Sequence, residues 1–423
     1  MSKSSSVKIT AYLKKRGGEK WLNYDLQSDY QLIIVIPSIA ESENLPTVIN
    51  SLNNCLLPKE ERVLVIVVVN NSVDASQQII SDNASTIDYL KQIKESGKLT
   101  FDIEYIDASS GRSALPAKDA GVGLARKIGM DQALLRFDYT KSNLGIVCLD
   151  ADCEVDKNYL EELTYFFRKN NRAAGVIRYR HKLTNEAIIC YEIFLHYYIL
   201  GLKHAGSPYA HHSIGSCIVI DPYTYVKIDG MNKQKAGEDF YFLEKAAKVI
   251  DISQIDSTTV YPSERKSWRV PFGTGQRMTR FVKEVKDEYM LYNPESFIIL
   301  KKFLIIYTKK VEAAQIVQNA KSISPALFEF LIINKLEENL KRILQNSKTD
   351  EQFYHQKKIW FDGFKTMKLI HYLRDNGYPD IPMFTALNRI FDLVDQTFEK
   401  DDSKSLPSIE KQIEYLEQLR ELT

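Results

Sequence analysis

The stretch that decides the fold is an apolar run that ends in two carboxylates, Leu144-Gly145-Ile146-Val147-Cys148-Leu149-Asp150-Ala151-Asp152. Such a run is typical of a buried strand in a parallel sheet. Side chains two residues apart on extended backbone share one face, so Asp150 and Asp152 are predicted to point at one spot. Mg²⁺ and Mn²⁺ favour one or two such carboxylates, together with substrate phosphates and water. The stretch therefore predicts a phosphate-bearing substrate held through a divalent metal, although Asp-x-Asp is also common where a loop starts.

Further apolar runs predict the rest of a doubly wound sheet. Buried strands are predicted at 32–37, at 63–69 and at about 101–106, and a helix is predicted over about 116–137. Alternating strands and helices indicate a mostly parallel sheet with helices on its faces. In such sheets ligands bind beyond the carboxyl ends of the strands, where Pro37, Asn70, Asp150 and Asp152 lie. The predicted fold class is therefore α/β, with the ligand site at this edge.

Five segments in this order resemble the GT-A nucleotide-sugar glycosyltransferases, in particular those like family 2. They are Ile36-Pro37-Ser38-Ile39-Ala40-Glu41-Ser42-Glu43-Asn44-Leu45, the loop from Asn70 to Ser76, Ala125-Arg126-Lys127-Ile128-Gly129 with Ala133, Leu149-Asp150-Ala151-Asp152, and Gly237-Glu238-Asp239. The resemblance covers about residues 32–290. It implies a GT-A-like (Rossmann-like), mostly parallel sheet flanked by helices. It also implies transfer of a sugar from a nucleoside diphosphate sugar to an acceptor hydroxyl, with Mn²⁺ or Mg²⁺ as cofactor.

The resemblance assigns residues to the metal and the donor. Asp152 is expected to bind the metal directly, and Asp150 to contact the ribose or a metal-bound water. Arg126 is expected to bring positive charge near the base or the phosphates, with a solvated helix face as the alternative. The other expected donor-site residues are Pro37, Ser38, Glu41, Asn70, Asn71, Ala151 and Arg269. Asn70 and Asn71 stand where the family usually has an aspartate that reads the nucleotide base, so the base stays open.

Asp239 is the candidate general base, and Glu238 is the candidate support for acceptor binding. Through the resemblance, an aspartate base implies an inverting reaction. Both residues precede a predicted helix, whose dipole favours acidic residues in its first turn and would keep Asp239 ionised. The acceptor side also includes Gly237, His212 and Trp268, the last within the cationic, glycine-containing segment 263–275. A surface loop is the alternative for 263–275, and a solvated or core-edge position is the alternative for His212.

Composition limits the classes of function. The chain has 423 residues, a net charge of +1 and five cysteines. Interspersed charges do not indicate a nucleic-acid partner, and an odd number of cysteines without paired spacing indicates a reducing compartment. Because no apolar run reaches the about 18 residues of a membrane span, a cytoplasmic enzyme without a transmembrane segment is expected. The acceptor is left open between a glycan, a lipid carrier and a small metabolite.

Three regions are predicted: an N-terminal extension over 1–30, a GT-A-like catalytic domain over 31–292 and an all-helical C-terminal domain over 293–423. Amphipathic helices are predicted over 188–202 and 297–307, and further helices over 327–344 and 359–373. A last helix carries the stripe Ile409, Ile413 and Leu416, which is expected to pack on the body. A peripheral membrane contact through 297–307 and an oligomer formed by the C-terminal helices are left open.

Two other functions fit parts of the sequence. A non-catalytic nucleotide-sugar-binding protein would explain Asn70 and Asn71, but not the presence of Asp150, Asp152 and Asp239. A sugar-phosphate nucleotidyltransferase of similar fold would need a glycine-rich phosphate loop with an arginine after the first strand, and residues 36–40 contain neither.

Overall fold

The computed structural model describes residues 3–16, 19–170, 172–263, 288–309, 311–401 and 405–423. The chain divides into two compact units. The first contains the described residues of Met1–Lys182 and Ser213–Gly275, and the second contains those of Leu183–His212 and Gln276–Thr423. The second unit therefore takes a segment from the middle of the chain as well as its C-terminal part. The predicted division at 30/31 and 292/293 stays a prediction.

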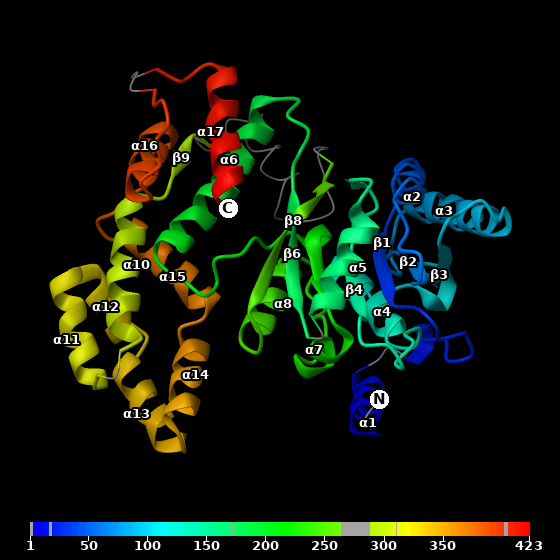
Figure 1. Ribbon diagram of the computed structural model, residues 1–423, viewed down its shortest axis with the longest axis horizontal. Coiled ribbons are helices and arrows are strands. Elements are labelled where there is room, and N and C mark those ends of the chain that lie inside the picture. Colours follow the sequence, from blue (N-terminus) through cyan, green and yellow to red (C-terminus); the bar gives the residue numbers. More distant parts are fainter. Residues whose placement is uncertain (1–2, 17–18, 171, 264–287, 310, 402–404) are drawn as a thin grey trace. The chain divides into compact units, whose positions relative to one another are not determined.

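Among the described residues, the first unit is built around an eight-stranded sheet in the order β3-β2-β1-β4-β7-β6-β8-β5 (Figure 1). The strands are β1 (Leu32–Ser38), β2 (Val63–Asn70), β3 (Asp102–Ala108), β4 (Gly145–Cys148), β5 (Glu154–Val155), β6 (Ala174–Tyr179), β7 (Ile218–Ile220) and β8 (Ile252–Tyr261). β3, β2, β1 and β4 are mutually parallel, and β6 is parallel to β8. β7 and β5 are antiparallel to their neighbours. The predicted strands and the mostly parallel α/β sheet are confirmed.

Helices cover both faces of this sheet. α4 (Val122–Ala133) packs on β1, β2 and β4, so closely that a Cβ added at Gly129 would overlap Val35. α5 (Tyr159–Lys169) places Phe167 against Gly145, and this contact lies on the other face. The assignment follows from the register, because Val35 pairs with Cys148 and residue 145 points away from residue 148. The unit also contains α1 (Lys3–Arg16), α2 (Leu45–Asn53), α3 (Gln77–Glu95), α7 (Pro222–Lys227) and α8 (Glu238–Ala247). Every residue of β2 is buried, as expected of a strand covered on both sides.

A buried polar cluster ties the N-terminal helix to this body. The hydroxyls of Tyr12 in α1 and Tyr225 in α7 both donate to Asp131 Oδ1 in α4, at 2.8 and 2.7 Å. Lys127 Nζ donates to Asp131 Oδ2 at 2.6 Å and to the Tyr12 hydroxyl at 2.8 Å. Gly230 follows α7 with a left-handed φ of 66°, and a Cβ there would overlap the Tyr12 hydroxyl. The cluster holds α1, α4 and α7 together.

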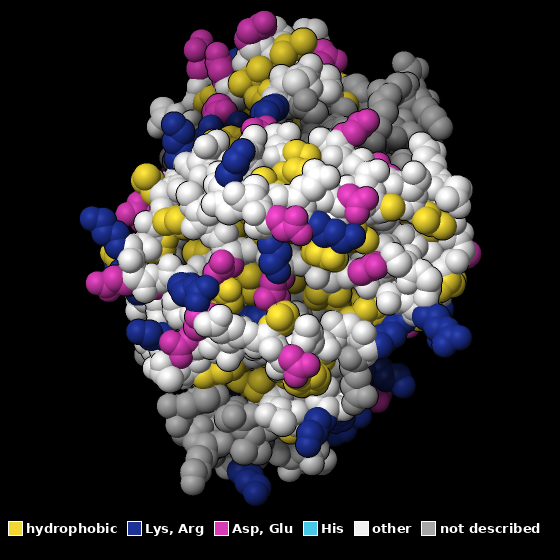
Figure 2. All heavy atoms as spheres, turned by 90° about the vertical axis from the view of Figure 1, so that its right-hand side faces the viewer, with side chains coloured by type: hydrophobic (Ala, Val, Ile, Leu, Met, Phe, Trp, Pro, Cys, Tyr) yellow, Lys and Arg dark blue, Asp and Glu magenta, His cyan; other side chains and the backbone are white. Residues whose placement is uncertain are grey.

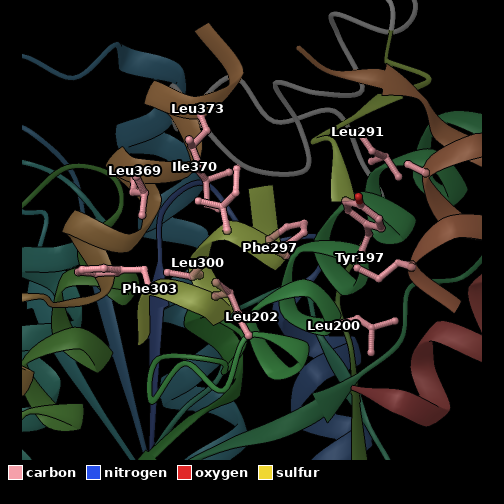
Figure 3. Packing of buried hydrophobic residues seen from close by; sticks show 14 of the residues in the cluster. Tyr197, Leu200, Leu202, Leu291, Phe297, Leu300, Phe303, Leu369, Ile370 and Leu373 are labelled. Carbon is pink, nitrogen blue, oxygen red and sulfur yellow. The ribbon is translucent and has the colours of Figure 1, made fainter. Parts of the chain in front are cut away.

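The described part of the second unit is helical apart from the short strands β9 (Met290–Leu291) and β10 (Ile381–Pro382). Its helices are α6 (Glu186–His204), α10 (Pro294–Tyr307), α11 (Ala313–Ile323), α12 (Pro325–Ile333), α13 (Leu336–Asn346), α14 (Asp350–Trp360), α15 (Gly363–Asp375), α16 (Met383–Leu393) and α17 (Ile409–Leu422). α6 shares one hydrophobic core with the C-terminal helices, in which Tyr197, Leu200 and Leu202 gather with Phe297, Leu300 and Phe303 of α10 (Figure 3). In the described part of the chain no helix has both the length and the apolarity to cross a bilayer.

Some helix predictions need correction. α6 is buried along most of its length rather than on one face. The helix predicted over 327–344 is two helices, because the chain turns at Lys335 with a φ of 52°. The one predicted over 359–373 is also divided, since α14 ends at Trp360 and α15 starts at Gly363. In α17 the buried stripe is formed by Tyr415, Leu416 and Leu419, whereas Ile409 is exposed.

The surface agrees with the balanced charge of the sequence. On the face that Figure 2 shows, acidic and basic side chains lie interspersed among scattered hydrophobic ones. A face with such mixed charges attracts neither a polyanion nor a polycation over a long range.

Candidate functional site

The centre of the candidate site is the guanidinium of Arg126, which projects from α4 between two carboxylates. Its Nη2 donates to Asp150 Oδ1 at 2.5 Å, and its Nη1 forms an ion pair with Glu238. Arg126 is 3% exposed, so the predicted alternative of a solvated helix face is wrong. Gly215, at the start of a short 3-10 turn, lies against this guanidinium, where an added Cβ would overlap it. A residue without a side chain is needed here for the close approach.

Several acidic side chains surround the guanidinium of Arg126 and influence its pKa. Burial alone would lower the pKa of Arg126, but Asp150 and Glu238 raise it above its ordinary value, so the guanidinium stays charged. Burial raises the pKa of Glu238 to about 7, against the opposing effect of Arg126. Burial also raises the pKa of Asp239, against the opposing effects of Arg126 and of the Phe240 N–H. Burial therefore shifts both carboxyl groups toward their protonated forms.

The carboxylate motif lies in a turn. β4 ends at Cys148, and residues 150–152 form the turn that leads into β5. The prediction that Asp150 and Asp152 lie on extended backbone is therefore wrong. Asp150 is fixed by Arg126 and by its carbonyl, which accepts from the Cys153 N–H at 3.2 Å. Ala151 is buried, and Asp152 is partly exposed.

A divalent cation would find only part of its ligands here. Within the described residues, no three His, Cys, Asp or Glu side chains converge in a way that would hold a metal ion. Asp150 already has one oxygen on Arg126. The turn fits a cation that takes one or two carboxylates and completes its coordination with phosphate oxygens and water, as Mg²⁺ commonly does.

The loops after β1 and β2 lie beside each other at the same edge of the sheet. Pro37 pairs with Val68 and Ser38 with Val69 at the carboxyl ends of these strands. Beyond Ser38, the chain turns through Ala40, which has a φ of 50°, into the buried Glu41. Glu41 Oε2 accepts from Asn44 Nδ2 at 2.8 Å, immediately before α2. Glu41 thus helps to fix the start of this helix.

Asn70 and Asn71 use most of their side-chain polar groups inside the protein. Asn70 Nδ2 donates to the carbonyls of Ser38 at 2.9 Å and Val68 at 3.2 Å. Asn71 Nδ2 donates to the carbonyls of Ser72 at 2.9 Å and Ser109 at 3.2 Å. Asn71 Oδ1 accepts from Asn83 Nδ2 at 2.7 Å. The Asn71 side chain is therefore committed to the loop itself.

Asn83 and Gly215 are the residues that sequence reasoning missed. Asn83 lies in the middle of α3, is 1% exposed, and bonds both loops. A signal was present, because Asn83 shares the helical spacing of Ile87 and Leu90 and so occupies the buried stripe of an amphipathic helix. A polar residue in such a stripe needs buried partners. Gly215 carried no comparable signal.

Asp239 lies beside this centre at the start of α8. Gly237 precedes the helix with a left-handed φ of 70°. Asp239 Oδ1 accepts from the Phe240 N–H at 2.7 Å, and the side chain is partly exposed. Arg126 and Asp150 are near enough to act on its pKa. The structure therefore brings together the predicted Arg126, Asp150, Glu238 and Asp239.

Other predicted residues are not part of this cluster. His212 belongs to the second unit, where its ring packs edge-on against His196 with 4.6 Å between centroids. Burial lowers the pKa of His212, so the ring is neutral at ordinary pH. Arg269 and Trp268, and the segment 263–275 from residue 264 onward, lie outside the described residues.

No protein-family model and no curated protein matches this sequence. Among solved structures, the chain is similar to residues 1–349 of TarS from S. aureus in complex with UDP-GlcNAc, with 14% identity, a TM-score of 0.41, and 82% of this chain and 93% of that chain covered. The same TarS fragment with UDP gives 14% identity and a TM-score of 0.39, over 89% of this chain and 98% of that one. The mannosyltransferase PcManGT from Pyrobaculum calidifontis, in complex with GDP-Man and Mn²⁺, gives 10% identity and a TM-score of 0.37, over 88% of this chain and 93% of that one. At these identities and TM-scores the likeness assigns no activity.

Proposed function

We propose that this chain is a metal-dependent glycosyltransferase that moves a sugar from a nucleoside diphosphate sugar to an acceptor hydroxyl. The observation that carries the proposal is the burial of Arg126 between Asp150 and Glu238. This contact joins the carboxylate turn after β4 to the acidic start of α8. The turn follows a parallel strand next to β1, at the edge where α/β sheets bind their ligands.

The donor half of the reaction needs stabilisation of a departing diphosphate. A divalent cation bound with the diphosphate supplies a Lewis acid for the charge that develops there. Asp152, which is partly exposed, is the proposed direct ligand, and Asp150 is the proposed contact to the ribose or to a metal-bound water. Arg126 holds Asp150 in place and adds a permanent positive charge beside the turn.

The acceptor half needs a base. Asp239 is proposed to take the proton of the acceptor hydroxyl as this oxygen attacks the sugar carbon, and inversion at that carbon follows from a single displacement. Burial raises the pKa of Asp239 and makes it a stronger base than an exposed aspartate. Glu238 is proposed to support the acceptor by hydrogen bonding, with its carboxyl group held in place by Arg126. A cytoplasmic location is part of the proposal, and the five cysteines are buried and form no disulfide within the described structure.

Thermal unfolding with nucleotides tests the donor site. UDP, GDP, CDP and dTDP are each added with and without Mn²⁺, and the unfolding midpoint is recorded. A ligand at one hundred times its dissociation constant adds about 2.7 kcal/mol to the folded state, which is a readable shift. One nucleotide is expected to give a Mn²⁺-dependent shift that Asp152→Asn abolishes. Asp88→Asn, at an exposed position of α3, is the control and should keep the shift. No shift with any nucleotide would contradict the donor site.

Turnover of the corresponding nucleotide sugars separates catalysis from binding. Release of the nucleoside diphosphate is followed for wild type and Asp239→Asn. The variant is expected to bind the nucleotide as wild type does and to lose about 10²–10⁴-fold in turnover. Wild-type turnover in Asp239→Asn would rule out this base. Binding without any turnover in the wild type would favour a non-catalytic nucleotide-sugar-binding protein.

A further inference from the structure

Asn83 of α3 hydrogen-bonds to both loops at the proposed donor edge. Its Oδ1 accepts from the Ala40 N–H at 2.9 Å, in the loop after β1. Its Nδ2 donates to the Asn70 carbonyl at 3.0 Å and to Asn71 Oδ1 at 2.7 Å, at the end of β2. All three of these contacts are made by one amide that is 1% exposed. The two loops therefore share one buried anchor.

The preceding residue of α3 reinforces the first loop. Asp82 Oδ1 accepts from the Ser42 N–H at 3.0 Å, and Asp82 Oδ2 accepts from the Ser42 hydroxyl at 2.7 Å. Ala40 and Ser42 thus bond to consecutive residues of one helix. This matters because Ala40 has a φ of 50°, a left-handed conformation that a residue with a side chain adopts at a cost. The bonds from α3 hold the loop in this unfavourable conformation.

The same contacts determine which groups remain for a ligand. Asn71 has both its amide nitrogen and its Oδ1 bound within the protein. Asn70 has its nitrogen bound to two carbonyls, so its orientation is fixed, and none of the described residues donates to its Oδ1. Asn83 sets the position of the Asn70 backbone directly. A base or ribose contact at this edge therefore depends on a loop whose geometry is fixed from α3.

We infer that Asn83 and Asp82 are positioning residues that shape the binding surface for the nucleoside part of the donor, an inference that rests on the proposed function. Neither side chain contacts the ion-pair cluster of Arg126, Asp150 and Glu238 in the described structure. Their loss changes the loops after β1 and β2 and leaves the groups for chemistry in place. The role is therefore in nucleotide affinity and not in the catalytic step.

The test compares Asn83→Ala with Thr86→Val. Thr86 is a buried polar residue on the same helix. Within the described residues its hydroxyl bonds only to the Asp82 carbonyl one turn earlier, so its replacement leaves both loops anchored. The dissociation constant for UDP, GDP, CDP and dTDP with Mn²⁺ is measured by calorimetry, and KM and kcat are measured with the nucleotide sugar that the wild type uses. Asn83→Ala is expected to raise the dissociation constant and KM about tenfold or more, with kcat within about threefold of wild type. Thr86→Val is expected to leave all three values unchanged.

The outcomes separate this inference from the proposed function. If wild type binds a nucleotide and folded Asn83→Ala binds it equally well, the inference is wrong and the donor site stands. A fall in kcat with an unchanged KM would also overturn it. If wild type binds none of the four nucleotides, the proposed function fails and the inference fails with it. Should Asn83→Ala not fold, Asp82→Ala decides, because Asp82 lies at a partly exposed position. An unchanged KM in Asp82→Ala would then contradict the inference.

Discussion

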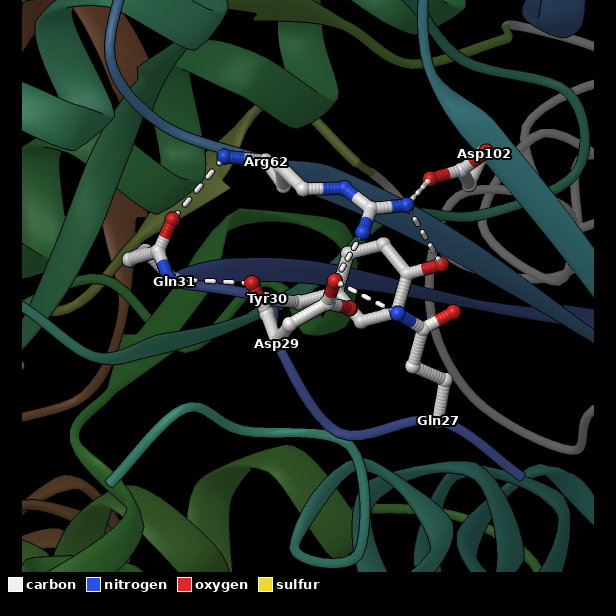
Figure 4. Close-up of polar contacts among 6 residues, drawn as sticks. All are labelled: Gln27, Asp29, Tyr30, Gln31, Arg62 and Asp102. Carbon is white, nitrogen blue, oxygen red and sulfur yellow. Dashed lines mark hydrogen bonds and ion pairs between the residues drawn. The ribbon is translucent and has the colours of Figure 1, made fainter. Parts of the chain in front are cut away.

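Arg126 and Glu238 form an ion pair in which the two side chains are only 3% and 4% exposed. The first unit contains a second arginine between two acids, since Arg62 pairs with Asp29 and Asp102 (Figure 4). The Arg62 side chain, however, is 46% exposed. The same arrangement of charges therefore occurs at two depths in one molecule, which makes the exposed cluster a control for the buried one.

Replacement of the two arginines by methionine should have unequal effects on stability. Arg126→Met leaves the buried Glu238 and the partly exposed Asp150 without their cation and is expected to lower the free energy of unfolding by about 3–5 kcal/mol. Arg62→Met removes solvated ion pairs and is expected to cost at most about 1 kcal/mol. Urea unfolding of the two variants and the wild type measures both values. Equal losses in the free energy of unfolding would show that burial does not make the Arg126 cluster more important for stability than the Arg62 cluster.

Glu238 predicts a pH dependence of stability. Its pKa is raised from 4.5 to about 7 in the folded state. Between these values the folded chain holds a proton that the unfolded chain has released, so the contribution of Glu238 to stability falls as the pH rises through this window. The slope for one proton is at most about 1.4 kcal/mol per pH unit.

Urea unfolding from pH 4.5 to pH 7 measures this effect. Glu238→Gln cannot lose a proton, so its stability relative to wild type should increase with pH over the window. Glu161→Gln, at an exposed site in α5, controls for the loss of one negative charge. A difference between Glu238→Gln and wild type that stays constant with pH would contradict the raised pKa.

Gly230 and Tyr12 should be energetically coupled. Gly230→Ala places a Cβ against the Tyr12 hydroxyl and on a left-handed residue, so a loss of at least about 2 kcal/mol is expected. Tyr12→Phe removes a buried hydrogen bond to Asp131 and is expected to cost about 1 kcal/mol. The double variant lacks the overlapping oxygen. Its loss in the free energy of unfolding should therefore be smaller than the sum of the two single losses by at least about 0.5 kcal/mol. Thermal or chemical unfolding of all four proteins completes the cycle, and strict additivity would disprove the contact.

Lys335→Gly should stabilise the second unit. Lys335 is exposed and has a φ of 52°, which glycine adopts without the clash that a Cβ causes. We expect a gain of about 0.5–1 kcal/mol in the free energy of unfolding after the greater flexibility of the unfolded glycine is counted. Lys341→Gly, at an exposed interior position of α13, should instead lose about 1 kcal/mol. If Lys335→Gly and Lys341→Gly changed the free energy of unfolding in the same direction, the left-handed conformation of Lys335 would be contradicted.

The sequence was most informative where a long apolar pattern leaves one choice of structure. Val63–Asn70 has apolar side chains at nearly every position, which only a strand covered on both faces accommodates, and the prediction was within one residue. The break at Lys335 could not be predicted in the same way. Ile333, Leu336 and Leu340 keep a helical spacing across it, and a lysine carries no preference for the left-handed turn that interrupts it.

The candidate site was predictable as a set of residue types but not as a set of contacts. Arg126, Asp150 and Glu238, which were predicted as site residues, do lie together in the structure. The sequence did not indicate that a single guanidinium lies between the two carboxylates, because an arginine next to Lys127 in a helix is equally expected on a solvated face. Its burial depends on the Gly215 backbone, which belongs to a distant part of the chain.

The membership of α6 in the second unit has a consequence for synthesis of the chain. Its apolar side chains, such as Ile193 and Tyr197, leave the ribosome well before α10, α15 and α17, with which they form a core. At a translation rate of about 5–20 residues per second, this surface stays uncovered for several seconds. During this time the segments of the first unit that precede and follow α6 in the sequence begin to fold. A chaperone that holds apolar segments would act at this stage. Any shortened version of the protein that ends before α10 would keep α6 without its partners and should aggregate.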